Sequence, residues 1–339
     1  MLRTSLCDLV GIRHPVVLAG MAGGNTSPEL VAAVSNAGGL GVFGASWLTS
    51  TDIRGHAARI RELTSAPFGL NLLLFAHDDD RLDAVLAERP PVVSFAWPAS
   101  DQPLASIFAR AHDAGAKVMH MVPSVREALW AAEAGADIIV AQGTEGGGHV
   151  GVMGAIALVP QVVDAVPDRP VLAAGGIADG RGLAAALALG AAGVLVGTRF
   201  LATYESPLHS NFKQAILTSD GHDTDLTVLP DVLSGRIWPG ALARVWRNAF
   251  IREWAGCEWE LRQRRPQILA ETRAAREAGD ADRTVLWFGQ DAGLIRSIEP
   301  AAEVVARMVQ EAHEIVTGRL AHMAGPGAPS GTLAPGSGS

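Results

Sequence analysis

Cysteine, lysine and aromatic residues are scarce in this chain, and each shortage excludes a kind of chemistry. The 339 residues include two cysteines, Cys7 and Cys257, and neither stands in a Cys-x-x-Cys or Cys/His spacing. A disulfide framework and a cysteine-based metal site are therefore excluded, and unpaired thiols are typical of a reducing cytoplasm. The two lysines, Lys117 and Lys213, offer no evident Schiff-base residue for an aldolase, because neither is expected at the carboxyl end of a strand.

An excess of positive charge and long apolar runs are also missing. The formal net charge is −8, whereas a nucleic-acid-binding protein needs a basic face to displace counterions. The amino terminus has no sustained apolar stretch of the kind found in signal peptides. The longest apolar run, residues 182–196, is shorter than the ~20 residues that span a bilayer. We therefore expect a cytoplasmic protein with neither a nucleic-acid nor a membrane partner.

The short motifs of hydrolases and metalloenzymes are absent as well. The sequence contains no HExxH, no GxSxG and no Walker A lysine, and its potential metal ligands do not cluster. We therefore expect no metal site.

Glycine (38 residues) and apolar residues (48%) are abundant, and from residue 15 to 200 they form a repeating pattern. A short apolar run is followed by a glycine or polar turn and then by an alanine-rich amphipathic segment. Runs that are apolar throughout predict parallel strands covered on both faces. The expected strands are 16–19, 40–43, 68–73, 92–95, 117–122, 137–141, 171–174 and 193–196, and the expected helices include 28–37, 52–63, 104–114, 125–134 and 180–189.

Eight strands that alternate with helices predict an α/β fold, and eight such units close naturally into a (β/α)8 TIM barrel. A doubly wound open sheet stays an alternative, because strand count alone does not separate the two. After Phe200 the pattern changes to charged helical segments. We therefore expect a barrel formed by residues 1–204 and 285–320 with a closing helix over 300–317, a mostly helical substrate or lid domain over 205–284, and a disordered tail over 321–339.

Tryptophan is concentrated in the expected lid, which contains Trp238, Trp246, Trp254 and Trp259. We expect these side chains mainly to pack the lid, with an aromatic substrate channel as the alternative.

The segment most informative about function follows the sixth strand and reads QGTEGGGHVG over residues 142–151. Barrel enzymes place their active sites at the carboxyl ends of the strands. Gly147 and Gly148 leave the backbone open to a ligand, and His149 then presents an imidazole, the side chain that changes charge closest to neutral pH. We predict His149 as the catalytic residue. The formal GxGxxG match at 146–151 is not a dinucleotide fingerprint, because it does not open the first βαβ unit.

Glycines at the ends of the last two strands predict a phosphate cradle. Gly175 and Gly176 follow the seventh strand, and Gly197 and Thr198 follow the eighth. Barrels commonly bind phosphate there with backbone N–H groups and a helix N-terminus. Asp179 is expected to cap the helix that follows.

Two other strand ends supply further candidates. Gly20, Met21 and Ala22 follow the first strand, where small residues let a planar ligand approach the backbone. Asn71 lies inside the third strand and is a buried amide in need of partners. His120 ends the fifth strand, and we expect it to be structural.

Together these segments resemble the nitronate monooxygenase (formerly 2-nitropropane dioxygenase) family. The matching pieces run in order from about residue 14 to 295, and the most specific are 142–151 and AAGGIADGRG at 173–182. At two places this chain differs from the usual family pattern. Ala19-Gly20 precede Met21 where the family usually has Gln-Ala or Ala-Pro, and residues 119–121 read Met-His-Met where some members have a polar or lysine side chain.

The resemblance implies a barrel that binds FMN without a covalent link, and it implies a role for each candidate residue. His149 matches the family's active-site histidine. The implied cofactor-binding residues are Gly20, Met21, Ala22, Asn71, Gln142, Gly147, Gly148, Gly175, Gly176, Gly197, Thr198 and Gln290, the last in a C-terminal turn that closes the flavin site. The implied partners are a small-molecule nitronate and O2, with a homodimer left open.

The implied reaction is FMN-dependent oxidation of alkyl nitronates, with nitroalkanes as a further substrate, by O2 to a carbonyl compound and nitrite. An NAD(P)H:quinone reductase and an FMN-dependent enoyl-ACP reductase remain alternatives on the same barrel. Residues 230–290 show no obvious basic patch for acyl carrier protein, which weighs against the enoyl reductase. Flavin binding without turnover, and a colourless barrel aldolase or isomerase, are the alternatives from other classes.

Overall fold

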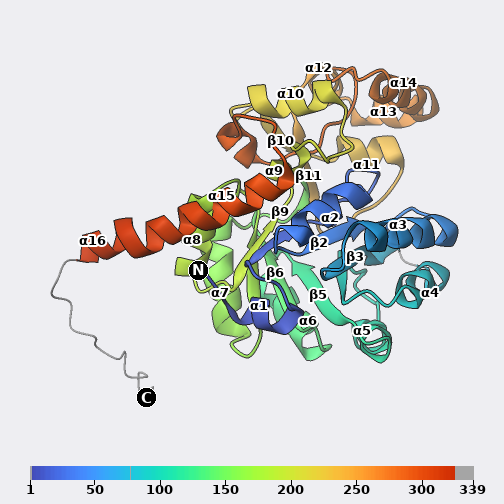
Figure 1. Ribbon diagram of the computed structural model, residues 1–339. Coiled ribbons are helices and arrows are strands. Elements are labelled where there is room, and N and C mark those ends of the chain that lie inside the picture. Colours follow the sequence, from blue (N-terminus) through green and yellow to red (C-terminus); the bar gives the residue numbers. More distant parts are fainter. Residues whose placement is uncertain (1, 77, 325–339) are drawn as a thin grey trace, which may run out of the picture.

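The computed structural model describes residues 2–76 and 78–324, and its centre is a sheet of eight parallel strands (Figure 1). The strand order is β1-β9-β8-β6-β5-β4-β3-β2, and a parallel bridge between Val17 and Leu40 joins β1 to the entrance of β2. This closure confirms the TIM barrel and excludes the open sheet. The strands are β1 (Val16–Leu18), β2 (Gly41–Gly44), β3 (Phe68–Leu73), β4 (Val92–Ala96), β5 (Lys117–Val122), β6 (Ile138–Gln142), β8 (Val171–Ala174) and β9 (Gly193–Val196).

Helices surround the barrel, and side chains cap the first turns of several of them, including α8, which Asp179 caps as predicted. The Ser27 hydroxyl accepts from the backbone N–H of Leu30, and the Asp179 carboxylate accepts from that of Arg181. The helices around the barrel are α1 (Ser5–Val10), α2 (Pro28–Asn36), α3 (Ser50–Leu63), α4 (Asp79–Ala87), α5 (Leu104–Asp113), α6 (Val125–Glu133), α7 (Ala155–Ala165), α8 (Gly180–Ala188) and α9 (Thr198–Leu201), with a 3-10 turn η1 (Leu74–Ala76) after β3.

The chain returns to the barrel through a long C-terminal helix. α15 (Ala301–Glu314) packs against α8 and α2, and continues through a π-helical turn η3 (Ile315–Leu320) into α16 (Ala321–Ala324). The expected tail over 321–339 therefore begins as a helix, and its remaining residues, 325–339, lie outside the described part of the chain.

The apolar core has two layers, one inside the barrel and one between the strands and the helices. Val17, Val42, Met119, Val140 and Leu172 fill the interior, while alternate residues of the same strands pack against the helices. Each strand is buried on both faces, and this is why the strands are largely apolar and recognisable in the sequence.

Most of the lid lies between residues 205 and 284, beyond the carboxyl ends of the strands, at the top of Figure 1. It is mostly helical, as predicted, and has its own core around Val245, Ile251 and Trp254. Its elements are α10 (Ser210–Thr218), β10 (Thr224–Thr227), α11 (Leu229–Ser234), β11 (Leu242–Trp246), α12 (Ala249–Trp254), α13 (Glu258–Gln263) and α14 (Arg265–Glu277), followed by the 3-10 turn η2 (Gln290–Leu294).

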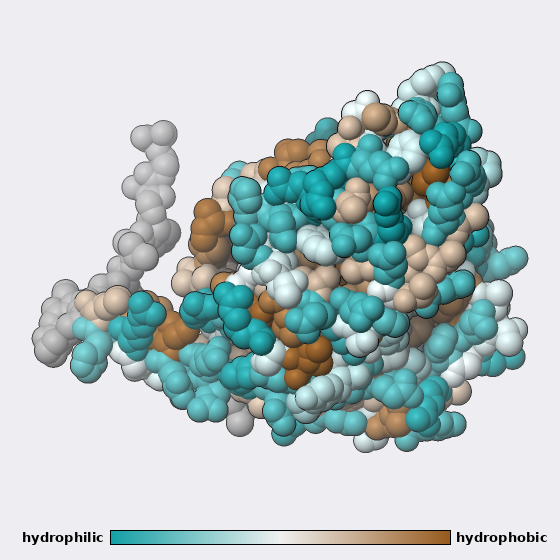
Figure 2. Space-filling model, turned by 90° about the horizontal axis from the view of Figure 1, so that it is seen from above, coloured by the Kyte–Doolittle hydropathy of each residue, from teal (hydrophilic) through white to brown (hydrophobic). Residues whose placement is uncertain are grey.

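A small antiparallel sheet, not predicted from the sequence, joins the lid to the barrel. β11 pairs with β10 on one side and with β7 (Gly148–Val150) on the other, so that His149 lies opposite Ala243. The face seen from the lid end is mostly hydrophilic, with separate small apolar areas (Figure 2). Over the described ranges no helix has the length and apolar character needed to cross a bilayer.

Candidate functional site

A cavity of about 570 Å³ lies between the carboxyl ends of the strands and the lid. All predicted site residues except one line it: Gly20, Met21, Ala22, Asn71, Gln142, Gly147, Gly148, His149, Gly175, Gly176, Gly197 and Thr198. Gln290 is the exception. Its side chain is exposed, because the first residue of η2 turns outward while its backbone N–H donates to the Glu145 carbonyl oxygen at 2.9 Å. The neighbouring Asp291 lines the cavity instead.

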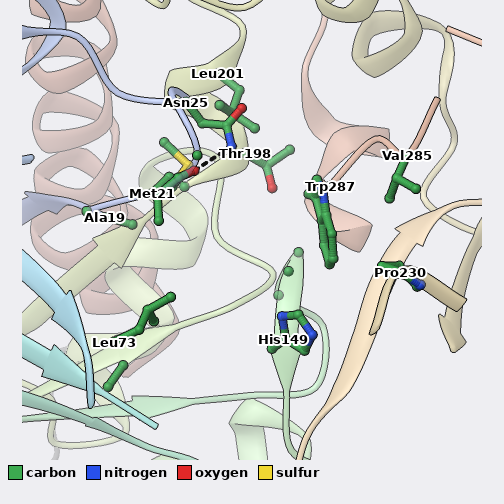
Figure 3. Close-up of a pocket in the computed structure, with 18 of the residues that line it drawn as sticks. Ala19, Met21, Asn25, Leu73, His149, Thr198, Leu201, Pro230, Val285 and Trp287 are labelled. Atoms are coloured by element: carbon green, nitrogen blue, oxygen red, sulfur yellow. Dashed lines mark hydrogen bonds between the residues drawn. The ribbon is translucent and has the colours of Figure 1, made fainter. Parts of the chain in front are cut away.

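His149 is held between the barrel and the lid. Its Nε2 lies 2.8 Å from Oδ1 of Asp231 on α11, and both side chains are largely buried. The Trp238 ring stacks on the imidazole, with 3.5 Å between the ring centroids and 9° between the planes. Trp287 packs nearby at 5.2 Å. Figure 3 shows His149 and Trp287 on one side of the cavity and Ala19, Met21 and Leu73 on the other.

The loop before His149 is fixed by a buried arginine and a partly buried glutamate. Arg244 on β11 donates through Nε to the Thr144 carbonyl oxygen at 2.8 Å and through Nη1 to the Thr224 hydroxyl at 3.0 Å. The Glu145 carboxylate accepts from the backbone N–H of Ala155 at the start of α7. The carboxylate is therefore a helix cap and does not face a substrate.

Gly148 is the glycine of this loop that faces open space. Its φ is +81°, and a Cβ placed on it would meet no atom within 4 Å. A side chain here would adopt a strained backbone conformation and would occupy the cavity.

Two amides stand at the floor of the cavity. Asn71 donates through Nδ2 to the Gly20 carbonyl oxygen at 3.1 Å, and a Cβ on Gly20 would come within 2.4 Å of the Asn71 Cβ. Gln142 is buried, and its Oε1 has no hydrogen-bond partner. A buried polar atom without a partner that faces a cavity indicates a ligand able to hydrogen-bond with it.

The predicted cradle lies at the ends of β8 and β9. Gly175 and Gly176 have φ of +92° and +76°, a left-handed backbone conformation that residues with a side chain rarely adopt. The Thr198 hydroxyl accepts from the backbone N–H of Gly289 at 2.9 Å. Beside it, burial raises the pKa of the Asp291 carboxyl to about 7, although a hydrogen bond from Thr198 and the charge of Arg199 act in the opposite direction.

The lid tryptophans are divided between packing and the cavity. Trp246 and Trp254 pack in apolar clusters, as expected, whereas Trp238 lines the cavity and Trp259 is 70% exposed. Trp47 and Trp97, from the barrel loops, also line the cavity, and both have positive φ (73° and 55°). Such strained backbone positions concentrate at functional sites.

His120 is structural, as expected from the sequence. It is fully buried against Phe108, at 5.4 Å between the ring centroids, and burial lowers its pKa to about 3. Among the described residues no group of three or more His, Cys, Asp or Glu side chains is arranged to hold a metal ion.

The sequence-based prediction missed several functional residues of the lid. Asp231, Trp238 and Arg244 come from a segment with no motif. They contact His149 or the loop before it, although they lie 82 or more residues away in the sequence. The only available signal was the placement of charged and aromatic side chains in the segment that covers the barrel.

Comparison with known proteins identifies the family. The sequence model for nitronate monooxygenase matches residues 3–80 and 75–311. The chain belongs to the nitronate monooxygenase family. A probable nitronate monooxygenase of Staphylococcus aureus (strain MSSA476) is 32% identical over 363 residues, covering 93% of this chain and 98% of the relative. The family makes the chain an enzyme, an oxidoreductase.

Other relatives carry different names. A "(3aS,4S,5R,7aS)-5-hydroxy-7a-methyl-1-oxo-octahydro-1H-indene-4-carboxyl-CoA dehydrogenase" of Rhodococcus jostii (strain RHA1) is 43% identical over 237 residues, which is 70% of this chain but only 65% of that relative. Among solved structures, FabK from Thermotoga maritima has a TM-score of 0.84 and 37% identity, covering 95% of this chain and 100% of FabK. A nitroalkane oxidase from Streptomyces ansochromogenes has a TM-score of 0.80 and 33% identity, covering 93% and 99%.

Nitronate monooxygenases and their relatives are in general flavin-dependent, and the cavity of this chain fits such a group. A volume of about 570 Å³ is within the range of small-molecule sites. The unpartnered Gln142 Oε1 offers a hydrogen bond to a heteroatom of a ring, and the space next to Gly148 accepts a flat group close to the backbone. The glycine cradle at Gly175 and Gly176, beside Thr198, suits a phosphate.

Proposed function

We propose that the chain binds FMN and oxidises alkyl nitronates, with nitroalkanes as a further substrate, by O2 to a carbonyl compound and nitrite. The observation that carries the proposal is the His149–Asp231 pair at the edge of the cavity. When bound, FMN supplies the capacity to accept electrons and to react with O2. Gly175, Gly176, Gly197 and Thr198 would hold its phosphate. Met21, Asn71 and Gln142 would contact its ring.

Asp231 determines which nitrogen of His149 is basic. A carboxylate only accepts hydrogen bonds, so the proton of the neutral imidazole stands on Nε2, 2.8 Å from Asp231. Nδ1 is then the atom that takes the α-proton of a nitroalkane, and the carboxylate stabilises the imidazolium that results. For a nitronate, which has already lost this proton, the protonated imidazole serves as a hydrogen-bond donor to the nitro oxygens.

Trp238 keeps this base in position. Its ring covers one face of the imidazole at 3.5 Å, which restricts rotation of His149 and excludes water from that face. Phe75 packs on Trp238 at 4.4 Å, and Trp97 contacts it at 6.2 Å. A base held by packing and by a carboxylate is suited to repeated proton transfer in one geometry.

An anaerobic titration of the purified yellow protein tests the proposal. An alkyl nitronate should bleach the flavin absorbance, while NADH and NADPH should not. His149→Ala should retain flavin and lose turnover by roughly 10²-fold or more. Rapid bleaching by a nucleotide with nitronate inert would overturn the proposal and identify a quinone or enoyl reductase. Undiminished turnover of His149→Ala would remove His149 from the reaction.

A CoA-linked substrate is the second candidate, favoured by the 43% identity to a protein named as a carboxyl-CoA dehydrogenase. In that case His149 would take a proton next to the thioester carbonyl. Bleaching by an acyl-CoA, but not by a nitronate, identifies this reaction in the same titration.

A further inference from the structure

The mouth of the cavity is lined by arginines, although the chain as a whole is acidic. Arg236 follows α11, and Arg273 and Arg276 belong to α14. Leu269 and Thr272 of α14 also line the cavity. Positions 269, 272, 273 and 276 follow the spacing i, i+3, i+4 and i+7, which places all four side chains on one face of the helix. One face of α14 therefore presents two guanidinium groups to the cavity.

These guanidinium groups lack acidic partners. In the part of the chain that the structure describes, no ion pair involves Arg236, Arg273 or Arg276, whereas neighbouring lid arginines such as Arg264 and Arg283 pair with glutamates. The acidic residues lining the cavity are Asp231, which is bound to His149, and Asp291, which is buried beside the cradle.

Arg236 and Arg273 are also close enough to repel each other. Burial and the charge of Arg273 lower the pKa of the Arg236 guanidinium, which lies over the Trp47 ring at 3.7 Å. Arg276 is anchored differently, by donating to the Asn25 side chain at 3.0 Å. Two mutually repelling, unpaired cations at the mouth of a cavity are a binding site for an anion that neutralises both.

We propose that Arg236 and Arg273 bind a phosphate-bearing part of a substrate or cosubstrate, whose other end reaches His149. The glycine cradle at the ends of β8 and β9 is proposed above to hold the FMN phosphate, so the arginines at the mouth would serve a second phosphorylated ligand. A guanidinium binds phosphate through paired N–H donors, and two of them suit a dianion better than a single carboxylate. This corrects the expectation that residues 230–290 have no basic patch, since their arginines gather at the cavity only in the fold.

CoA thioesters and NADPH both carry such phosphates, and the binding test separates them. The FMN-loaded protein is titrated by calorimetry with CoA, NADPH, inorganic pyrophosphate and phosphate-free pantetheine. We expect CoA or NADPH to bind, pyrophosphate to compete with the bound ligand, and pantetheine to bind far more weakly. Arg236→Gln and Arg273→Gln should each weaken binding roughly tenfold, and the double variant more. Arg262→Gln, an exposed lid residue outside the cavity, is the matched control.

Binding that is equally strong in Arg236→Gln/Arg273→Gln and the wild type would overturn the proposal. So would the failure of CoA, NADPH and pyrophosphate to bind at millimolar concentration. The inference concerns binding and does not depend on nitronate turnover. A protein that oxidises nitronates but binds none of these probes refutes the docking site alone, and one that binds CoA but is inert to nitronates refutes the proposed reaction alone.

Discussion

At the scale of single residues, the site depends on side chains that hold others in position. His149 is flanked by a carboxylate on its Nε2 side and by an indole on one face. The imidazole has little freedom to rotate, and its Nε2 is paired with the Asp231 carboxylate. Removing the carboxylate charge should therefore change the chemistry of the ring more than its location.

Asp231→Asn tests this division of labour. The amide can donate its N–H to Nε2, which moves the imidazole proton to Nδ1 and leaves the wrong nitrogen basic. We expect kcat for a neutral nitroalkane to fall at least ~10-fold with little change in KM. Steady-state kinetics of the flavin-loaded variant measures this. Asp280→Asn, at an exposed lid position outside the cavity, should behave like the wild type, and equal kcat in both variants would contradict the role of Asp231.

Gly148→Ala tests how closely the ligand approaches the backbone. The added methyl group occupies the cavity at a φ of +81°, with a strain of about 1 kcal/mol. We expect a folded protein with much less bound flavin, measured by the absorbance ratio of flavin to protein. Gly115→Ala is the matched control, because Gly115 has a φ of +86° and open space but does not line the cavity. Full flavin content in Gly148→Ala would show that the ligand lies elsewhere.

At the scale of secondary-structure elements, β7 and β11 determine where His149 lies. β7 contains only three residues and pairs with a strand about ninety residues later in the chain. Ala243 of β11 pairs with His149. The next residue, Arg244, holds the loop before His149 by donating to the Thr144 carbonyl oxygen.

Replacing Arg244 should loosen this junction. Arg244→Met leaves the Thr144 carbonyl and the Thr224 hydroxyl without their donor, at a cost of about 3 kcal/mol in the free energy of unfolding. Denaturant titration measures the loss. Arg262→Met, which changes an exposed arginine of the same lid, should cost far less. Equal stability of the two variants would mean that Arg244 does not support the loop.

The same elements explain what sequence reasoning reached and what it missed. β3, β5, β8 and β9 have the predicted bounds, because a strand buried on both faces is apolar at most positions. β7 was missed because a glycine-rich run has no alternation, and only a distant partner makes it a strand. His149 was recognisable from its glycine setting, but Asp231 was not, because their contact depends on the lid folding back over 82 residues.

At the scale of the whole molecule, buried ionisable groups link stability to pH. The pKa of Asp291 is raised to about 7 by burial. Between its ordinary value near 4 and this value, the folded state binds more protons than the unfolded state, so Asp291 makes stability fall as pH rises. His120, whose pKa is lowered to about 3, has the opposite effect over much of the same range.

A variant separates the two contributions. The stability of Asp291→Asn relative to the wild type, both without FMN, should rise between pH 5 and pH 8 by about 3 kcal/mol. The effect of His120 cancels in this difference because both proteins contain it. Urea denaturation at the two pH values measures it, with the exposed Asp113→Asn as control. A pH-independent difference would mean that Asp291 is ionised in the folded state at pH 5.

The pairing of β7 with β11 has one further consequence. His149 does not stand on the barrel alone: its backbone is a strand of the lid's own sheet, and its ring is bound to α11 and stacked on Trp238. Any outward swing of the lid that widens the entrance must pull on the same strand and disturb the same ring. Access and reactivity would thereby be coupled, because a lid movement that widened the entrance would also displace the imidazole.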